Sequence, residues 1–429
     1  MTLIETSKCK LKFLNYKGLG VGQTDKGLVE LPYTLENEIV EFERHKYRGH
    51  LEFVLKNVIE ESPNRVKPQC TYFGACGGCL LQHLNPNIYN NFKLGLLKDS
   101  LIEKDIRNNI APLISIPFGQ RRRANMEILK KNDRIFLGFY RFHSHQIINI
   151  DQCPAILDSL SNLIEPLKLI FRKILTDRQK AQIFLNQASN GIHLIFDVRD
   201  QYFLSEENRQ EMVRFCHKYN IIQLILSAIN SKEIVIYETA RPYIEIDGVR
   251  VGIEANSFSQ ATYLSDHILK KLVLDFFLSD IISPSKNMRV ADLFCGRGTF
   301  TIPLSRHFST TGFELDHKSL QAIRKAAVDS NLLIELEERN LFDFPLINTL
   351  LNHYKFIVIN PPRAGALAQS QNLAVSIVEK IVYISCNPRS FARDAKVLIE
   401  GGYKLNNIIP LDQFPFTTHL EVVGLFQRL

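Results

Sequence analysis

The feature that most constrains the fold lies after residue 288, where short apolar segments alternate with helical ones. Two helices are expected in this region, over 317–330 and 389–400. The predicted strands around them are 289–294, 311–315, 356–359 and 381–385. Strands that alternate with helices indicate a parallel, doubly wound α/β sheet. Because ligands of such sheets bind at the carboxyl ends of the strands, residues just after these strands are the first candidates for a functional site.

The first of these strands runs directly into a glycine turn. Residues 290–294 are followed by Gly296 and Gly298 and then by a helical segment. A strand, a Gly-x-Gly turn and a helix form the usual cradle of an adenosine cofactor. Glu314 ends the next strand, where a carboxylate can accept hydrogen bonds from both ribose hydroxyls. A dinucleotide site needs a third glycine at position 301, which is Thr301 here, so the loop favours S-adenosylmethionine (SAM) over NAD.

The length of 429 residues predicts about three domains. Residues 1–58 contain short alternating strands separated by glycines, which fits a small β-barrel. Residues 59–250 are expected to form a central α+β domain, and residues 251–429 the α/β domain. Within the central domain the sequence predicts a loop over 63–84, a helix over 88–106 and strands between 124 and 150.

Composition excludes several classes of protein. Hydrophobic residues make up 45% and charged residues 23%, which excludes wholesale disorder, a collagen-like chain and a coiled-coil rod. No apolar run approaches the roughly 20 residues of a membrane helix, and the first residues lack the pattern of a secretory signal. We therefore expect a cytoplasmic protein without a membrane partner. The net charge of +7 suits a polyanionic partner but is also common in proteins without one.

Three of the eight cysteines lie in one glycine-rich loop. Cys70, Cys76 and Cys79 have the spacing C-x5-C-x2-C. Three thiolates on one tight loop suit a [4Fe–4S] cluster that a distant fourth ligand completes, and Cys153, which precedes a proline, is the best candidate. Structural zinc sites more often contain two C-x2-C pairs, and this chain has one. The spacing therefore favours an iron–sulfur cluster over zinc.

Two residues near the carboxyl edge of the predicted sheet suit covalent chemistry. Cys386 follows the strand over 381–385, where a thiolate could add to a carbon electrophile, although most single cysteines only pack. Glu421 precedes a final predicted strand over 422–426 and is a candidate general base. An ordinary surface glutamate is the commoner alternative for Glu421.

A second motif, Asn360-Pro361-Pro362-Arg363, follows the strand over 356–359. The prolines stiffen the loop, and Arg363 could pair with an anion or with a base carbonyl. Asn-Pro-Pro also occurs in amino-group methyltransferases, where it holds an exocyclic amine, so that activity is a rival interpretation of this motif.

Taken in order, the motifs resemble those of the RNA uracil-5 methyltransferase family over nearly the whole chain. The first part of the resemblance consists of C-x5-C-x2-C, Gln152-Cys153-Pro154, Gln120-Arg121-Arg122-Arg123-Ala124 and Phe258-Ser259-Gln260. The second part consists of Asp292 to Gly298, Pro361 to Gly365, Ser385-Cys386-Asn387-Pro388 and His419-Leu420-Glu421. Each motif is modest alone, but their order and spacing are specific.

The resemblance implies a Rossmann-like SAM-dependent methyltransferase domain after an RNA-binding TRAM β-barrel and an iron–sulfur domain. It implies that the helix over 88–106 may pack on the catalytic domain. The residues that it places at the SAM site are Gln260, Phe294, Gly296, Gly298, Glu314 and Asn360. The residues that it places on RNA are Arg121, Arg122, Arg123 and Arg363, although a solvated charged turn explains the arginine run equally well before the resemblance is considered.

The implied reaction is 5-methyluridine formation through a covalent adduct. The Cys386 thiolate attacks C6 of uracil, C5 takes the methyl group of SAM, and Glu421 removes the C5 proton before elimination frees the cysteine. The family usually has Asp where this chain has Asn360, and Asn where it has Thr262. Both departures could weaken the orientation of the cofactor or the uracil.

Several alternatives remain for the partner and the reaction. A TRAM domain with an iron–sulfur cluster is more typical of the 23S ribosomal RNA members than of the tRNA members, so 23S rRNA is expected and tRNA is the alternative. An RNA cytosine-5 methyltransferase shares the covalent chemistry but usually shows a Pro-Cys motif, which is absent at Cys386. A non-catalytic RNA-binding assembly factor is the most distant alternative. We expect a monomer.

Overall fold

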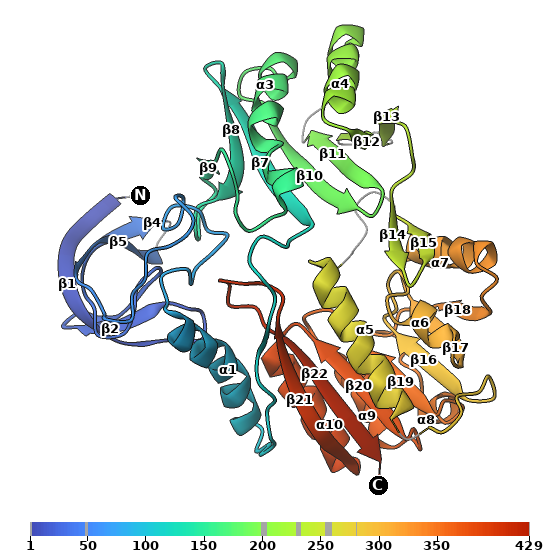
Figure 1. Cartoon of the computed structure of the whole chain (residues 1–429). Coiled ribbons are helices and arrows are strands. Elements are labelled where there is room, and N and C mark those ends of the chain that lie inside the picture. The colour runs from blue at the N-terminus through green and yellow to red at the C-terminus, as the bar shows by residue number, and fades with distance from the viewer. Residues whose placement is uncertain are drawn as a thin grey trace.

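The computed structural model describes residues 2–47, 50–198, 204–228, 233–253, 260–279 and 281–428. These residues form three large sheets and one two-stranded ribbon. Figure 1 shows that the N-terminal sheet, the central sheet and the C-terminal sheet lie around a common middle region, with the last strands of the chain next to helix α1.

The N-terminal sheet has the strand order β3-β2-β1-β4-β5. The strands are β1 (Thr2–Leu14), β2 (Gly20–Thr24), β3 (Gly27–Leu31), β4 (Ile39–Tyr47) and β5 (His50–Glu60). The long strand β1 pairs with β4 through its first part and with β2 through its last part, with a register shift between Leu11 and Phe13. Because β3 also contacts β5, the sheet curls into a barrel-like shape around a small core that includes Leu11, Val29 and Phe42.

The central sheet has seven strands in the order β13-β12-β11-β10-β7-β8-β9. The strands are β7 (Arg123–Lys131), β8 (Arg134–Tyr140), β9 (Ile147–Asn149), β10 (Lys180–Ala188), β11 (Gly191–Val198), β12 (Ile221–Ala228) and β13 (Ile234–Glu238). The helices of this region are α2 (Asp158–Ser161), α3 (Ile164–Ile174) and α4 (Glu206–Lys218). Apolar side chains of α3 and α4, such as Leu167 and Phe215, join those of the strands in one core.

The C-terminal sheet has eight strands in the order β18-β17-β16-β19-β20-β22-β21-β6. The strands are β6 (Ile114–Ser115), β16 (Arg289–Leu293), β17 (Ser309–Glu314), β18 (Ile334–Glu338), β19 (Phe356–Ile359), β20 (Lys380–Ser385), β21 (Tyr403–Asp412) and β22 (Glu421–Arg428). All neighbouring pairs are parallel except those of β22, which is antiparallel to both β20 and β21. The predicted doubly wound α/β sheet is confirmed.

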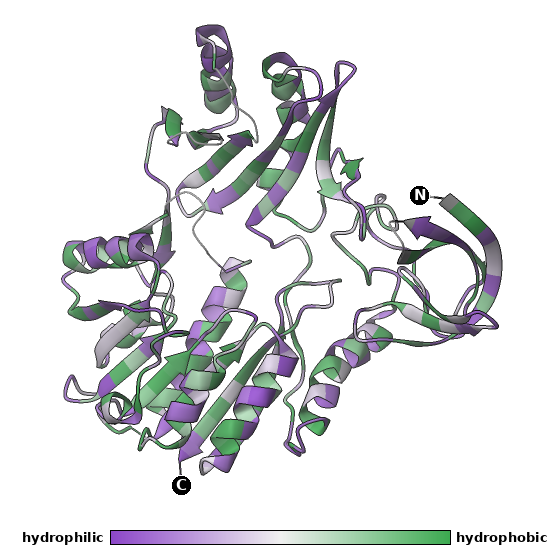
Figure 2. Ribbon diagram, turned by 180° about the vertical axis from the view of Figure 1, so that it is seen from behind, coloured by the Kyte–Doolittle hydropathy of each residue, from purple (hydrophilic) through white to green (hydrophobic). Residues whose placement is uncertain are grey.

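Helices cover both faces of the C-terminal sheet. The helices are α1 (Pro86–Ile102), α5 (Tyr263–Leu278), α6 (Thr301–Ser305), α7 (His317–Asp329), α8 (Asn348–Leu351), α9 (Leu367–Ala374) and α10 (Pro388–Glu400). Leu97, Leu373 and Phe391 of α1, α9 and α10 belong to the core on one face, and Val273 of α5 belongs to the core on the other. Figure 2 shows the strands between these helices as largely hydrophobic, as burial on two faces requires.

The predicted boundary at residue 250 divides a strand and needs correction. Strand β15 (Val249–Gly252) pairs with β14 (Tyr243–Ile246) in a two-stranded ribbon. Ile244 and Val251 of this ribbon share a core with Ala326 of α7, so the ribbon packs on the C-terminal domain. Strand β6 also belongs to the C-terminal sheet although it precedes the central strands, and α1 contacts α10.

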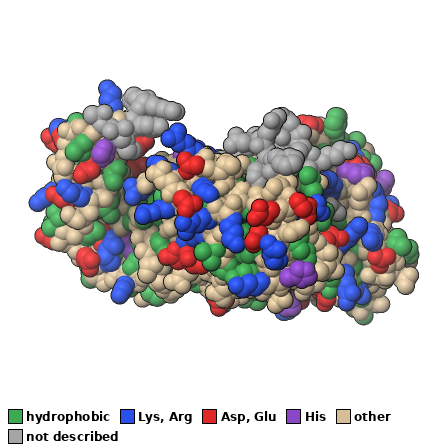
Figure 3. Space-filling view, turned by 90° about the horizontal axis from the view of Figure 1, so that it is seen from above, with side chains coloured by type: hydrophobic (Ala, Val, Ile, Leu, Met, Phe, Trp, Pro, Cys, Tyr) green, Lys and Arg blue, Asp and Glu red, His purple; other side chains and the backbone are tan. Residues whose placement is uncertain are grey.

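On the face that Figure 3 shows, charged side chains do not gather into a patch of one sign. Lys and Arg side chains are interspersed there with Asp and Glu side chains. The net charge of +7 therefore does not by itself mark a binding surface. Within the described ranges, no helix is both long enough and apolar enough to cross a membrane.

Candidate active site

Strands β20 and β22 place the predicted nucleophile beside the predicted base. Cys386 directly follows β20, and Glu421 is the first residue of β22. The antiparallel register pairs Ser385 with Val422, so the next positions along the ladder are Cys386 and Glu421. Burial, together with the negative charge of Glu421, raises the pKa of the Cys386 thiol to about 11, against a lowering by Arg363. The sheet therefore brings three predicted site residues within electrostatic reach of each other.

Glu421 is a buried carboxyl group rather than a surface one. Its exposed fraction is 3%. Burial raises the pKa of Glu421 to about 7, against a lowering by the hydrogen bond that Gln413 donates. The distance from Gln413 Nε2 to Glu421 Oε2 is 2.5 Å. A carboxyl group with a pKa near neutrality is suited to exchange a proton at physiological pH, which a general base must do.

Helix α1 holds the loop between β21 and β22, which is residues 413–420. Lys93 of α1 is fully buried, and its Nζ lies 2.8 Å from Asp412 Oδ1 and 2.6 Å from the carbonyl oxygen of His419. Tyr89 donates its hydroxyl to Asp412 and accepts a hydrogen bond from the Phe416 backbone amide at 2.9 Å. These contacts fix both ends and the middle of the loop, and thus the backbone on either side of Gln413 and Glu421.

The glycine turn after β16 leaves room for a ligand. Gly296 and Gly298 have positive φ angles of 55° and 82°, which favour glycine. A Cβ atom added to Gly296 would meet nothing within 4 Å. Glu314 at the end of β17 accepts hydrogen bonds from the backbone amides of Gly296, Leu315 and Asp316 at 2.9, 2.8 and 3.0 Å. A carboxylate has about four acceptor sites, so about one remains for a bound hydroxyl. The geometry fits an adenosine cofactor whose ribose lies beside Glu314.

Thr301 has a structural role at the position where a dinucleotide site would have glycine. Its hydroxyl lies 2.5 Å from Asp292 Oδ2, and both residues are completely buried. Burial raises the pKa of Asp292 to about 7, against a lowering by the hydrogen bonds from Thr301. The pair ties β16 to α6 across the glycine turn.

The ends of β16 and β19 lie side by side. The Asn360 backbone amide donates to the Leu293 carbonyl oxygen at 3.2 Å. Phe294 has a φ of 61°, and its ring centre lies 5.4 Å from that of Phe342. Asn360 therefore stands between the glycine turn and the strand that leads to Cys386, since β19 lies between β16 and β20.

Gln260 lies on the Glu421 side of the site. It is 7% exposed, and its Oε1 lies 3.5 Å from Gln413 Nε2. Phe258 and Ser259 of the same motif lie outside the described residues. Thr262 is the N-cap of α5, where its hydroxyl accepts the Ser265 backbone amide at 3.0 Å. Asn is an equally good N-cap, so the departure at Thr262 preserves the start of the helix.

The three consecutive arginines, residues 121–123, do not form one exposed surface. Arg122 is 1% exposed, donates to the Gln260 carbonyl oxygen at 2.9 Å and forms a 2.6 Å ion pair with Asp266. A side chain that is buried and paired in this way joins the central domain to α5, and an RNA contact of Arg122 stays a prediction. Arg121 is half-buried with its guanidinium 5.5 Å from the Phe414 ring centre, whereas Arg363 is exposed.

Arg123 is also half-buried. It opens β7, where it pairs with Asn186 of β10. Burial lowers the pKa of Arg123, and the neighbouring Arg122 and Arg121 lower it further.

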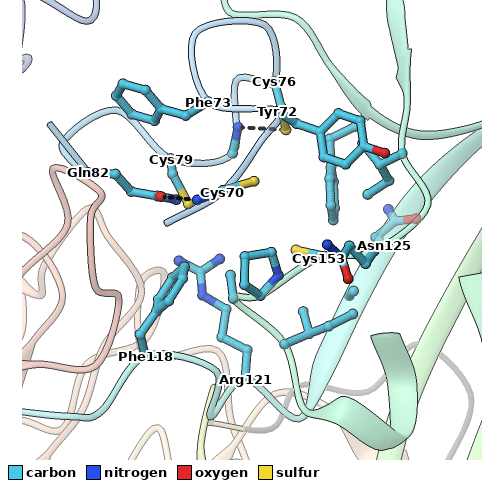
Figure 4. Close-up of a pocket in the computed structure, with 18 of the residues that line it drawn as sticks. Cys70, Tyr72, Phe73, Cys76, Cys79, Gln82, Phe118, Arg121, Asn125 and Cys153 are labelled. Atoms are coloured by element: carbon cyan, nitrogen blue, oxygen red, sulfur yellow. Dashed lines mark hydrogen bonds between the residues drawn. The ribbon is translucent and has the colours of Figure 1, made fainter. Parts of the chain in front are cut away.

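The four predicted cluster ligands line one cavity. Cys70, Cys76 and Cys79 lie on the loop before α1, and Cys153 lies across the cavity from them (Figure 4). The cavity has a volume of about 220 Å³. Burial is the main reason for the raised pKa values of the thiols, to about 11 for Cys76 and about 12 for Cys153. Within the described ranges, no three His, Cys, Asp or Glu side chains are grouped closely enough to hold a metal ion.

The cysteine loop, which is the segment before α1 that carries Cys70, Cys76 and Cys79, also contacts residues 413–420. The backbone amides of Leu80 and Leu81 donate to the Phe416 carbonyl oxygen at 2.8 and 3.1 Å. The Cys70 backbone amide donates a hydrogen bond to Gln82 Oε1 at 3.0 Å. Residues 413–420 are therefore held from one side by α1 and from the other by the end of the cysteine loop.

Sequence reasoning missed Lys93, Asp412 and Gln413. The sequence contains no local motif around Lys93, and its partner lies 319 positions away. Gln413 follows a strand, β21, that was not predicted because its apolar run is interrupted by polar residues from Lys404 to Asn407. Its position directly after a strand at the sheet edge is the signal that could have identified it.

Comparison with known proteins gives a consistent result. A family model described as tRNA (Uracil-5-)-methyltransferase matches residues 115–429. An RNA methyltransferase of Rhizobium meliloti is 32% identical over 434 residues, which cover 99% of this chain and 100% of that protein. The 23S rRNA (uracil(1939)-C(5))-methyltransferase of Shewanella sediminis is 30% identical over 422 residues, with 96% and 94% covered.

A solved structure shares the whole fold. The Pyrococcus abyssi tRNA (uracil-54, C5)-methyltransferase in complex with S-adenosyl-L-homocysteine superimposes with a TM-score of 0.72. The match covers 98% of this chain and 100% of that one at 23% identity. This likeness confirms the α/β methyltransferase architecture of the C-terminal sheet.

Proposed function

Since the chain belongs to the tRNA (uracil-5-)-methyltransferase family, we propose that it transfers a methyl group from SAM to C5 of a uridine in 23S ribosomal RNA through a covalent cysteine adduct. Membership of the family makes the chain an RNA methyltransferase. The observation that carries the covalent mechanism is the adjacency of Cys386 and Glu421 at the ends of β20 and β22.

The reaction follows from these two side chains. The Cys386 thiolate adds to C6 of the uracil, and the electron pair of the C5–C6 bond becomes available on C5. This carbon bonds the methyl group of SAM, and the sulfonium takes the electron pair of the broken bond. Glu421 then takes the C5 proton, the C5–H pair restores the double bond, and the S–C6 pair returns to the sulfur of Cys386.

The remaining site residues position the two substrates. The open space over Gly296 and the free acceptor capacity of Glu314 support a SAM site at the ends of β16 and β17. The target uridine has to leave its stack to reach Cys386. Arg363, exposed beside Cys386, and Arg121 are suited to hold RNA there, and the N-terminal barrel is proposed as a further RNA-binding domain.

Replacement of Glu421 by Gln tests the mechanism. The variant keeps the shape of the side chain and an acceptor for Gln413 but cannot take the C5 proton. We expect a covalent protein–RNA species that survives denaturing gels and carries the methyl label of SAM. Cys386→Ala should form no adduct while still binding SAM and RNA, and Cys216→Ala, which changes a buried cysteine of the central core, should behave as wild type.

The covalent mechanism would be refuted by normal turnover of Cys386→Ala. A Glu421→Gln variant that turns over normally, or that binds both substrates without forming a labelled adduct, would show that another group is the base. His419, half-buried with a pKa lowered by burial to about 4, is then the next candidate.

The choice of 23S rRNA rests on the Shewanella sediminis relative, whose match covers 96% of this chain and so includes most of the N-terminal residues outside the family model. A tRNA substrate is the second candidate, since both the family description and the Pyrococcus abyssi structure name tRNA. Mass mapping of 5-methyluridine in both RNAs, from a strain with and without this gene, distinguishes them. Loss of the modification from tRNA alone would refute the rRNA assignment.

We also propose that Cys70, Cys76, Cys79 and Cys153 hold a [4Fe–4S] cluster. A single zinc ion needs all its sulfurs at about 2.3 Å from one point, and the described cysteines are not grouped in that way. They surround a 220 Å³ cavity instead, as a polynuclear cluster with one thiolate per iron requires. The bound cluster would supply a rigid cross-link between the cysteine loop and the central domain.

Anaerobic purification tests the cluster. The protein should be brown and contain about four irons per chain. Cys153→Ser should lower the iron content, and Cys216→Ser should leave it unchanged because Cys216 lies in the core away from the cavity. Stoichiometric zinc without iron would overturn the assignment.

A further inference from the structure

Gln413 occupies the centre of the site without belonging to any motif of the sequence. It is the first residue after β21, is 1% exposed and lies between two predicted site residues. Its Nε2 is 2.5 Å from Glu421 Oε2 and 3.5 Å from Gln260 Oε1. Its own Oε1 is buried and has no hydrogen-bond partner among the described residues.

The orientation of this amide follows from its neighbours. An ionised carboxylate only accepts hydrogen bonds, so the NH₂ group of Gln413 has to face Glu421. The amide carbonyl then points away from Glu421, into a place where the described residues offer it no donor. A buried carbonyl without a partner costs free energy, and an apolar side chain of similar size would avoid that cost. Packing alone therefore does not account for an amide at this position.

We propose that Gln413 is a positioning residue that keeps Glu421 ionised and correctly oriented to remove the C5 proton, and that it connects Glu421 to Gln260. This inference rests on the proposed function, because it assigns Gln413 to the second half of the covalent reaction. Thiolate addition and methyl transfer do not require Glu421 to accept a proton, so the action of Gln413 is confined to the resolution of the adduct.

The hydrogen bond acts on the ionised form of Glu421. A donor stabilises a carboxylate more than the protonated acid, and burial of Glu421 removes the water that would otherwise do so. The adjacent described residues that can carry charge near the pair are Arg363, after β19, and Cys386, after β20, whose raised pKa of about 11 keeps its thiol neutral at pH 7. On the side of α1, Lys93 and Asp412 form their own ion pair at 2.8 Å. Gln413 is the hydrogen-bond donor that the described structure gives to the Glu421 carboxylate.

The test uses Gln413→Met, which preserves the length and most of the volume of the side chain and removes the donor. The labelled adduct should form at the wild-type rate in a single turnover. Its breakdown should be about tenfold slower at pH 7, and the pH of half-maximal breakdown should move upward by about one unit. The adduct should therefore accumulate at pH 7 and much less at pH 9.

Gln369→Met is the matched control. Gln369 is also 1% exposed, and its amide bonds the backbone of Leu346 from α9, away from Glu421. This variant should lose stability without any change in the pH profile of adduct breakdown. If Gln413→Met does not fold, Gln413→Asn retains an amide but is too short to reach Glu421, and the same shift is expected.

The outcomes separate this inference from the proposed function. If Glu421→Gln accumulates adduct but folded Gln413→Met, or Gln413→Asn, resolves it with the wild-type pH profile, Gln413 has no positioning role. If Cys386→Ala turns over normally, the covalent mechanism itself is refuted, whatever the Gln413 variants do. A slower formation of adduct in Gln413→Met, with unchanged breakdown, also overturns the inference.

Discussion

The ion pair between Lys93 and Asp412 gives the sharpest test of how α1 supports the site. Both side chains are almost completely buried, at 0% and 1% exposure, and Lys93 also donates to the carbonyl oxygen of His419. Lys93→Met leaves the Asp412 carboxylate buried without its countercharge, with Tyr89 as the donor that remains. Removal of one partner of a buried pair costs about 3–5 kcal/mol. We expect a loss of this size in the free energy of unfolding of the C-terminal domain.

Urea unfolding followed by far-UV circular dichroism measures this loss. Lys93→Met combined with Asp412→Asn should recover much of the stability, because no uncompensated charge is then buried. Lys271→Met, which breaks the exposed pair with Asp275, is the control and should cost less than about 1 kcal/mol. A Lys93→Met variant within 1 kcal/mol of wild type, or a double variant no more stable than the single one, would refute the reasoning.

Three further outcomes are expected. Since burial raises the pKa of Cys386 to about 11, the single-turnover rate of adduct formation should rise about tenfold per pH unit from pH 7 to 9; a flat profile would contradict this. Arg122→Met should lower the free energy of unfolding by roughly 3 kcal/mol, because it leaves Asp266 without this ion-pair partner. Thermal melts that compare Arg122→Met with the double variant Arg122→Met, Asp266→Asn test this cause. Asn360→Asp should keep or raise activity in a methyl-transfer assay, because Asn360 is expected to act by hydrogen bonding alone. A large loss of activity would contradict this role.

The periodicity of the sequence predicted the strands that have apolar residues on both faces. β16, β19 and β20 are buried and mostly apolar, with Asp292 as a buried polar residue within β16, and each was placed within one or two residues of its bounds. β18 and β21 contain exposed polar residues because they lie toward the edges of the sheet, and local pattern did not identify them. The boundary at residue 250 failed for a related reason, since the ribbon of β14 and β15 is short and its packing on α7 is a tertiary contact.

For the site, residue type and position after a strand were enough to bring Cys386 and Glu421 together at one edge of the sheet, and their catalytic roles stay predictions. The same reasoning did not indicate the burial of Arg122, because a run of three arginines looks alike whether a member is solvated or buried. Arg122 precedes β7 and is buried through its ion pair with Asp266 of α5, which is a contact between residues far apart in the sequence. Lys93 and Gln413 act through contacts with residues distant in sequence or on a loop, and composition does not report such contacts.

The position of β22 has a consequence for the order in which the enzyme becomes functional during synthesis. It is the last described strand along the chain, yet it lies inside the sheet between β20 and β21 and begins with Glu421, the proposed base. Domains made early on the ribosome fold first, at chain growth of about 5–20 residues per second. Lys93 of helix α1 is therefore synthesised many seconds before Asp412, which lies 319 positions later in the chain. Until then Lys93 lacks its ion-pair partner. On the proposed mechanism, a chain that has not yet added β22 contains the glycine turn after β16 but lacks Glu421, so we expect it not to resolve the adduct.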